Sequence, residues 1–230
     1  MRLVTVAGPP SSGKTSVIIK AAGYLKTKGL KTGVIKFDCT ITYDDQAYEK
    51  YQIPVKVGLS GTLCPDHFFI SNIEECLQWG VQKDIDVLII ESAGLCNRCA
   101  PHIKDALAIC VIDNLSGINT PKKIGPMLKL ADIVVITKGD IVSQAEREIF
   151  TFRVKQANPR AAIMNINGIT GQGAYDLGVM LETAPALDKL EGRRLRFSMP
   201  AAMCSYCLGE TKIGKEYQRG YVKKMNWQSE

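Results

Sequence analysis

The most informative segment of the chain reads Gly8-Pro9-Pro10-Ser11-Ser12-Gly13-Lys14-Thr15, a complete G-x-x-x-x-G-K-[ST] pattern. An apolar run precedes it and a helix-like segment follows it, which is the context that gives the pattern its meaning. Its glycines let successive backbone N–H groups turn toward a phosphate, and the helix N-terminus adds its positive dipole end. Lys14 would then neutralise phosphate charge and the Thr15 hydroxyl would reach Mg²⁺. The predicted phosphate-binding residues are Gly8, Pro10, Ser11, Ser12, Gly13, Lys14, Thr15 and Ser16.

Short apolar runs alternate with longer helix-like segments along most of the chain. The predicted strands cover residues 3–7, 32–37, 87–90, 108–112, 133–137 and 161–166. Several are continuously apolar, as strands buried on both faces are. The predicted helices cover residues 15–28, 66–82, 121–131, 143–156 and 174–187. This alternation predicts a doubly wound α/β domain, with a mostly parallel sheet and helices on both of its faces.

The periodic pattern ends near residue 193. We therefore expect a nucleotide-binding domain over residues 1–192 and a small C-terminal extension over 193–230, which carries the C-x-x-C pair Cys204 and Cys207. The formal net charge is +6, and much of it lies after residue 188. The segment shows no aromatic-interleaved basic motif of the kind that single-stranded nucleic-acid binders use, so a solvated face is the preferred interpretation and no nucleic-acid partner is expected.

Apolar runs along the chain are short. None reaches the roughly 18 residues that a transmembrane helix requires, so no membrane association is expected. An apolar strand pattern begins directly at Met1, where a signal peptide would have a charged segment and a longer apolar core. The sequence therefore predicts a cytoplasmic location.

Two later strand ends carry groups suited to a nucleotide. The strand at 87–90 runs into Glu91-Ser92-Ala93-Gly94, where the acid could hold Mg²⁺ through water and the Gly94 N–H could approach a γ-phosphate. The strand at 133–137 runs into Thr137-Lys138-Gly139-Asp140, which resembles the guanine-reading N-K-x-D motif. The Asp140 carboxylate would accept two hydrogen bonds from guanine. Thr137 cannot reproduce the hydrogen bonds of an asparagine amide, so ATP stays open beside GTP.

The order of these motifs resembles that of the nickel-insertion GTPases of hydrogenase and urease maturation, which are SIMIBI-class P-loop GTPases. The resemblance covers most of residues 1–187 and includes a last loop with Asn167 and Gly168, where the family touches the base. The segment Lys36-Phe37-Asp38 looks like the family's first switch. The resemblance implies Mg²⁺-dependent GTP hydrolysis with Lys14, Asp38 and Glu91 as the catalytic residues. It also implies a nucleotide-dependent homodimer, and a target metalloenzyme or its accessory proteins as partners.

Two cysteine-containing segments extend the resemblance. Gly61-Thr62-Leu63-Cys64-Pro65-Asp66-His67 is similar to the T-G-G-C-P-H segment of the urease accessory GTPase, with Asp66 inserted before the histidine. In that family the Cys and His bind nickel or zinc between two subunits. The segment from Glu91 to Pro101 resembles one in which a metal-binding Cys precedes Pro; here Ala100 intervenes, and Cys96 forms a C-x-x-C with Cys99.

Several metal sites can be built from these groups. The candidate ligands are Thr15, Asp38 and Glu91 for Mg²⁺, and Cys64, His67, Cys96, Cys99, Cys204 and Cys207 for a softer ion. The two C-x-x-C pairs could share a tetrahedral zinc or an iron–sulfur cluster, form separate sites, or meet across a dimer. Redox dithiol chemistry competes with metal binding at these pairs. Cys76 and Cys110 are interpreted as buried apolar residues, and His102 as an exposed loop residue.

The leading interpretation is a GTPase that delivers Ni²⁺ or a similar metal, or a cluster, to a maturing metalloenzyme. Because Cys96 and Cys99 directly follow the expected γ-phosphate sensor, hydrolysis could move metal ligands. One alternative is an ATPase with a cysteine-ligated iron–sulfur cluster that activates or reduces a partner. Another is a regulatory switch in which zinc is structural and no metal is delivered.

Overall fold

A seven-stranded, all-parallel sheet forms the centre of the computed structural model, which describes residues 1–187, 189–198, 205 and 208–227. The strands lie in the order β3-β2-β4-β1-β5-β6-β7. Their bounds are β1 Arg2–Ala7, β2 Thr32–Asp38, β3 Val55–Leu59, β4 Val87–Ser92, β5 Leu107–Asp113, β6 Ile133–Thr137 and β7 Ala162–Asn165. The side chains of β1, β4 and β5 are mostly apolar on both faces of the sheet. This is the pattern expected of strands that helices cover on both sides.

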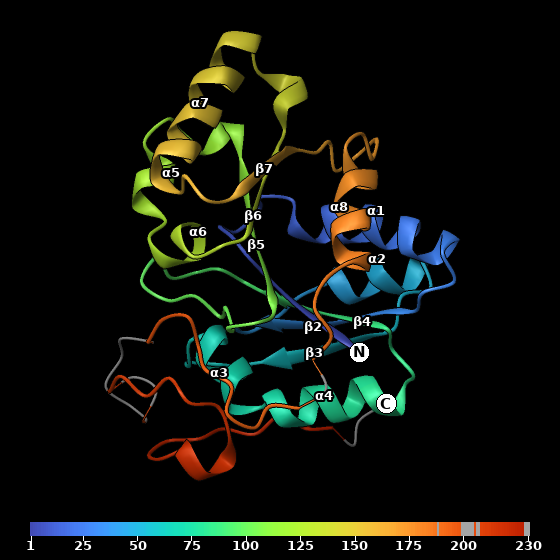
Figure 1. The fold of residues 1–230 in the computed structure, drawn as a ribbon, viewed down its shortest axis with the longest axis vertical. Helices are drawn as coiled ribbons and strands as arrows, with labels where there is room; N and C mark the ends of the chain where they lie inside the picture. Colours follow the sequence, from blue (N-terminus) through green and yellow to red (C-terminus); the bar gives the residue numbers. More distant parts are fainter. Residues whose placement is uncertain (188, 199–204, 206–207, 228–230) are drawn as a thin grey trace.

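Helices cover both faces of the sheet (Figure 1). Their bounds are α1 Lys14–Thr27, α2 Asp44–Lys50, α3 Pro65–Ser71, α4 Ile73–Gln82, α5 Thr120–Lys123, α6 Pro126–Lys129, α7 Gln144–Ala157 and α8 Ala174–Glu182. Side chains of α1, α2 and α8 pack in one core cluster with Val4 and Val6 of β1. On the opposite face, α3 and α4 pack around Leu3, and α6 and α7 pack around Ala7. The predicted doubly wound α/β fold is confirmed.

Five features differ from the predicted elements. The sequence did not indicate α2 or the edge strand β3, whose run Val55–Leu59 is interrupted by Lys56 and Gly58. The helix expected over 66–82 is broken at Asn72, and the one expected over 121–131 is broken at Gly125, which has a φ of +63°. The last helix ends at Glu182 and not at residue 187.

The described residues beyond 192 lie against α3 and α4 (Figure 1). Leu195, Ile213 and Met225 are buried in the same core cluster as these helices. The basic charges of this segment form ion pairs with the helices, such as Lys215 with Glu74 at 3.3 Å and Lys224 with Glu75 at 3.0 Å. The division at residue 192 stays a prediction, and Cys204 and Cys207 lie outside the described residues.

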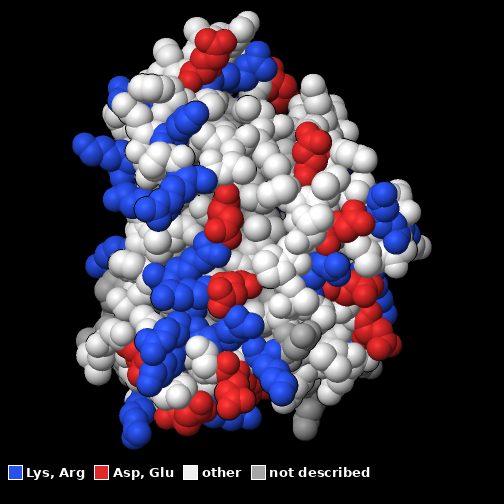
Figure 2. All heavy atoms as spheres, viewed as in Figure 1, with Lys and Arg blue, Asp and Glu red and all other residues white. Residues whose placement is uncertain are grey.

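Charged residues of both signs are exposed on the face drawn in Figure 2. In this view, lysines and arginines lie along the side of the molecule that α5, α6 and α7 occupy. Toward the bottom of the picture, acidic residues lie among them. Within the described residues, no helix is both long enough and apolar enough to cross a membrane.

Candidate functional site

The predicted phosphate-binding loop, residues 8–15 and called the phosphate loop below, connects β1 to α1 at the carboxyl edge of the sheet. Gly8 is required there because a Cβ at this position would lie 2.0 Å from the carbonyl oxygen of Val111. Lys14 is buried, and its Nζ donates to the carbonyls of Gly8 and Pro9, both at 2.9 Å. Burial lowers the pKa of Lys14, and the Glu91 carboxylate opposes that shift. The loop thus holds one ammonium group at its centre.

A polar cavity of about 350 Å³ opens beside this loop. Its lining joins loop residues, among them Pro10, Ser11, Gly13 and Ser16, to residues of three other segments: Lys36, Asp38, Asp44, Glu91, Ala93 and Leu95. Asp38 is half-buried at the end of β2, and one of its carboxylate oxygens accepts the N–H of Cys39 at 2.8 Å. The geometry therefore brings the predicted Lys14, Thr15, Asp38 and Glu91 to a single cavity.

Glu91 lies fully buried beside the cavity, and three groups donate hydrogen bonds to its carboxylate. The Thr15 hydroxyl donates at 2.9 Å, the Lys36 ammonium at 2.9 Å and the Tyr48 hydroxyl at 2.6 Å. Lys36 also forms an ion pair with Asp44. Burial alone would lower the pKa of Lys36, but the neighbouring Glu91 and Asp44 carboxylates outweigh burial and raise it. A positive charge therefore faces the carboxylate that sequence analysis assigned to Mg²⁺.

The end of β4 presses against the phosphate loop. Gly94 has a φ of +68°, and a Cβ there would lie 1.8 Å from the carbonyl oxygen of Gly8. The Ala93 carbonyl accepts from Lys14 Nζ at 3.4 Å. Because backbone meets backbone at this point, a shift of the strand end and a shift of the loop cannot occur independently.

Two of the predicted base-reading residues, Thr137 and Gly168, lie against the phosphate loop and the start of α1. The Thr137 hydroxyl donates to the carbonyl of Ser12 at 2.6 Å, a contact that ties β6 to the phosphate loop. Lys138 has a φ of +56°, and Asp140 is exposed. The Asn167 carboxamide oxygen accepts two backbone N–H groups of its own loop, and Gly168 lies against Ser16.

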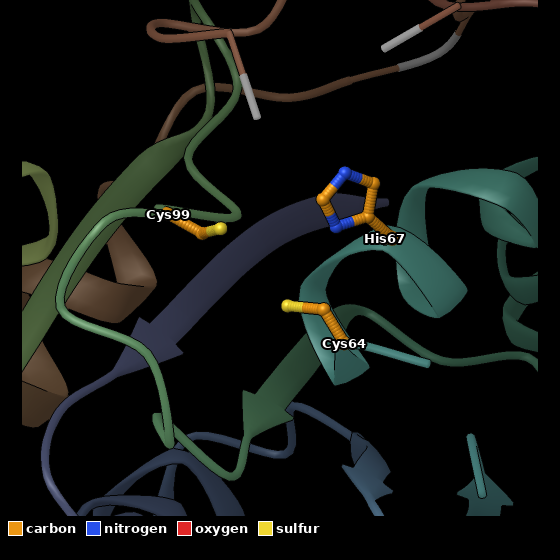
Figure 3. A group of neighbouring side chains, drawn as sticks. All are labelled: Cys64, His67 and Cys99. Atoms are coloured by element: carbon orange, nitrogen blue, oxygen red, sulfur yellow. The ribbon is translucent and has the colours of Figure 1, made fainter. Parts of the chain in front are cut away.

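A cluster of two cysteines and one histidine lies on the other side of the β4 end (Figure 3). Cys64 is the N-cap residue of α3, His67 lies in the first turn of that helix, and Cys99 lies in the loop after β4. Their ligand atoms all lie within 4.8 Å of one another, and Figure 3 shows the two sulfurs directed toward each other. Cys96 lies next to this cluster, and its sulfur is 3.8 Å from the sulfur of Cys99.

A hydrogen bond links the two cysteines of the cluster. Donation from the Cys99 thiol lowers the pKa of Cys64, against the opposing effect of burial. The same contact raises the pKa of Cys99 above the usual thiol value. These opposite shifts favour the thiolate form at Cys64, which is the form that binds metals, and a metal ion would displace the Cys99 proton.

The inserted residue Asp66 is buried between the two candidate sites. Its carboxylate accepts a hydrogen bond from the hydroxyl of Ser92, the last residue of β4. Burial raises the pKa of Asp66 to about 7, the Cys64 thiolate adds to that shift, and the Ser92 hydroxyl opposes it. The insertion keeps His67 beside Cys64, because residues three apart lie on one face of a helix.

His102 shows where the sequence interpretation was wrong. It is fully buried, not exposed, and its ring nitrogens lie 2.9 Å from the Thr5 hydroxyl and 3.0 Å from the Met127 carbonyl. Burial lowers its pKa to about 4. Lys36 and Tyr48 are site residues that sequence reasoning missed, although a lysine inside the apolar run of β2 was a usable signal for the first. Cys76 and Cys110 are buried, as interpreted.

Several curated proteins are similar to the chain over most of its length. An uncharacterized protein of Methanocaldococcus jannaschii is 50% identical over 226 residues, which cover 98% of this chain and 97% of that protein. The urease accessory protein UreG of Edwardsiella ictaluri is 29% identical over 193 residues, covering 77% and 91% of the two chains. UreG 2 of Methylorubrum populi is 30% identical over 190 residues, covering 76% and 87%.

Solved structures show the same fold. HypB from Helicobacter pylori in complex with nickel has a TM-score of 0.63 at 20% identity, covering 82% of this chain and 91% of that one. The hydrogenase maturation factor HypB from Archaeoglobus fulgidus has a TM-score of 0.62 at 21% identity, covering 79% and 89%. The family model for the nucleotide-binding domain of CobW, HypB and UreG matches residues 2–165. The resemblance drawn from the motifs is therefore confirmed, and the chain belongs to the CobW/HypB/UreG family of nucleotide-binding proteins.

Proposed function

We propose that this chain is a Mg²⁺-dependent GTPase whose nucleotide state controls the holding and release of a metal ion at Cys64, His67 and Cys99. The ion is cargo for a maturing metalloenzyme or its accessory proteins. One observation carries the proposal: the end of β4 contacts the phosphate loop on one side and leads directly to the cysteine–histidine cluster on the other. A nucleotide-dependent change at that strand end would therefore reach the metal ligands.

The donor set favours a single ion over a cluster. Two thiolates and one imidazole suit borderline ions such as Zn²⁺ and Ni²⁺, whereas iron–sulfur clusters are held mainly by four cysteines. A spread of 4.8 Å among the ligand atoms is compatible with one ion bound by all three. Cys96 is the proposed fourth ligand. Two sulfurs bound about 2.3 Å from one tetrahedral zinc ion lie nearly 3.8 Å from each other. The sulfurs of Cys96 and Cys99 are 3.8 Å apart in the structure. The relatives named for urease and hydrogenase maturation support nickel as the cargo.

Residues beside the phosphate loop fit a Mg²⁺–nucleotide complex. The Thr15 hydroxyl and the Glu91 carboxylate are oxygen donors, the type that Mg²⁺ prefers, and they already lie side by side. When bound, Mg²⁺ would neutralise charge on the β- and γ-phosphates. Lys14 would add its ammonium group to the same oxygens, and the Gly94 N–H would contact the γ-phosphate. Asp38 and Glu91 would orient the attacking water.

Base recognition is proposed at Asp140, with Thr137, Lys138, Asn167 and Gly168 shaping the pocket. GTP is the preferred nucleotide because Asp140 can pair with both N–H donors of guanine, and ATP is the alternative. A homodimer formed in the nucleotide-bound state is part of the proposal, as the family resemblance implies. Hydrolysis would then separate the subunits and loosen the metal.

The deciding experiment measures bound metal and acid-labile sulfide on protein purified without oxygen, with and without Mg²⁺ and a non-hydrolysable GTP analogue. We expect nickel or zinc at one ion per one or two chains, with an affinity that changes with nucleotide. Cys64→Ser and Cys99→Ser should each remove the ion, while Cys39→Ser, a half-buried cysteine outside the cluster, should retain it.

Two results would contradict the proposal. Iron with stoichiometric sulfide would make the chain an iron–sulfur protein. A tightly held zinc whose affinity ignores nucleotide would make it a regulatory switch with structural zinc. Comparison of GTP, ATP and their analogues in the same assay establishes the base preference independently of the metal.

A further inference from the structure

We propose that Asp66 is a positioning residue that links the metal ligands on α3 to the end of β4, so that nucleotide state reaches both halves of the metal site. The inference rests on the proposed function and concerns how its two sites communicate. We call Cys64 and His67 the helix half of the site, and Cys96 and Cys99 the loop half.

The two halves are attached to the nucleotide site in different ways. The loop half continues from Gly94 by only a few residues of backbone, so a shift at the strand end moves it directly. The helix half lies far away in sequence, and its own segment follows β3 at the edge of the sheet. Movement of the loop half alone would change the distance between the two sets of ligands. The hydrogen bond from Cys99 to Cys64 joins the halves, but a metal ion would displace its proton. A separate contact with the strand end is needed if the helix half is to respond when metal is bound.

The hydrogen bond between Asp66 and Ser92 is such a contact. Asp66 lies between Cys64 and His67 in sequence, and Ser92 lies between Glu91 and Ala93. Glu91 accepts from Thr15, and the Ala93 carbonyl accepts from Lys14, so Ser92 is flanked by two contacts with the phosphate loop. One hydrogen bond therefore connects the middle of the metal-binding segment to the middle of the strand end that contacts the nucleotide site.

Burial gives this bond its strength. Ser92 is 0% exposed and Asp66 is 2% exposed. Water cannot readily replace either partner, and separating them would leave a buried polar group unsatisfied. The bond is also directional, unlike the apolar contacts that hold α3 on the sheet. Those contacts include the rings of Phe68 and Phe69 against Phe37, with centroids 5.7 and 5.4 Å apart. Apolar burial of this kind is non-directional.

The test is the effect of nucleotide on Zn²⁺ affinity in the full chain. The Zn²⁺ dissociation constant is measured by competition with a chromogenic chelator, with and without Mg²⁺ and a non-hydrolysable GTP analogue. We expect the native ratio of the two constants to lie in the range of about 5- to 150-fold that is usual for coupled sites. Ser92→Ala and Asp66→Ala should each bring the ratio close to one, and the double variant should do no more than either alone.

Two further variants sharpen the result. Asp66→Asn keeps an oxygen that can accept the Ser92 proton, so it should retain a measurable part of the ratio. Ser71→Ala removes a buried hydroxyl at the far end of the same helix and should leave the ratio at its native value. Because linkage is reciprocal, Zn²⁺ should change the affinity for the GTP analogue by the same factor in the native chain, and should cease to do so in Ser92→Ala.

The possible results separate cleanly. A structural role would weaken Zn²⁺ binding equally with and without nucleotide, and an unchanged ratio in Ser92→Ala and Asp66→Ala would overturn the inference while leaving the proposed function intact. A ratio of one in the native chain would overturn both. If Asp66→Ala does not fold, Ser92→Ala decides alone, since it deletes one hydroxyl and no packing contact of α3.

Discussion

Lys36 places its ammonium group between two carboxylates in the interior of the nucleotide site. It is 4% exposed, donates to Glu91 at 2.9 Å and pairs with Asp44. Removing one partner of a buried ion pair leaves the other charge uncompensated, at a cost of about 3–5 kcal/mol. We predict that Lys36→Met lowers the free energy of unfolding of the nucleotide-free chain by roughly that amount.

Mg²⁺ with nucleotide should restore part of this loss, because the metal would supply a positive charge near the same carboxylate. Chemical denaturation of the native and Lys36→Met chains, each with and without Mg²⁺ and the GTP analogue, measures both effects. The matched control is Lys26→Met, whose ammonium group bonds Gln52 at the surface and should contribute little. Equal destabilisation by the two substitutions would contradict the prediction.

His102 should make stability depend on pH. In the unfolded chain it takes up a proton below pH 6.5, but burial holds its folded pKa at about 4. Between these values the unfolded state binds more protons, so the free energy of unfolding rises with pH and falls as pH drops through this window. Arg196 lowers the folded pKa further, and the Met127 carbonyl and Asp132 oppose the shift.

A difference of about 2.5 pKa units corresponds to at most about 3 kcal/mol between pH 7 and pH 4. His102→Gln cannot take up this proton, so its unfolding free energy should fall less steeply over the same range. Denaturant titrations at half-unit pH intervals compare the two slopes. Parallel curves for the native and His102→Gln chains would show that His102 does not titrate as described.

At the residue scale, sequence alone predicted the groups with a recognisable spacing. The phosphate loop, Glu91 and the cysteine pairs belong to local patterns, and their chemistry can be stated before any fold is known. Lys36, Tyr48 and His102 derive their roles from neighbours brought together by the sheet. Those contacts depend on tertiary structure, which no local spacing encodes.

Among the elements, the break between α3 and α4 organises the C-terminal segment. Asn72 is fully buried at this break, and its amide donates to the carbonyls of Phe68 at 2.6 Å and Lys223 at 3.1 Å. Its side-chain oxygen accepts the backbone N–H of Met225 at 2.8 Å. One side chain thus ends a helix and fixes a segment that is distant in sequence.

We predict that Asn72→Ala costs about 3 kcal/mol of stability, because it leaves buried backbone groups without partners. It should also make the chain near residue 225 the first point cut by a nonspecific protease. Limited proteolysis with mass spectrometry, together with thermal unfolding, tests both statements. Gln218→Ala, which removes a longer 3.4 Å bond from the same segment to Ser71, is the control. Similar cleavage rates for the two variants would refute the role given to Asn72.

The same break explains why element boundaries were harder to predict than element types. The apolar pattern continues through 66–82, so a single helix was expected, whereas in the structure Asn72 interrupts it and bonds the C-terminal segment. In β3, Gly58 is needed because a Cβ would lie 2.7 Å from the Phe37 ring. Lys56 and Gly58 interrupt the apolar pattern of this five-residue strand, so the sequence alone does not predict it.

For the whole molecule, the C-terminal segment forms part of the core on one face of the sheet. Leu195, Ile213 and Met225 contribute buried side chains to the cluster beneath α3 and α4, each worth about 1.5–3 kcal/mol. Their combined loss is comparable to the entire stability of a typical domain, about 5–15 kcal/mol. We predict that a chain of residues 1–192 does not fold cooperatively.

Circular dichroism and thermal unfolding of this shortened chain, beside the full chain, make the comparison. A cooperative transition at the native temperature would instead support an independent domain over residues 1–192, the division that periodicity predicts. Metal binding is measured on the full chain in either case, because the described part of the extension covers the helix that carries Cys64 and His67.

The bond from Thr137 to the Ser12 carbonyl has a consequence for how nucleotides would be told apart. It connects the strand end proposed to read the base directly to the loop proposed to hold the phosphates. A purine that displaces residues 138–140 would therefore also misalign the phosphate loop, and small misalignments slow chemistry severely. An incorrect base would then raise the nucleotide concentration needed to fill the site, and it would also lower the turnover rate of the filled site.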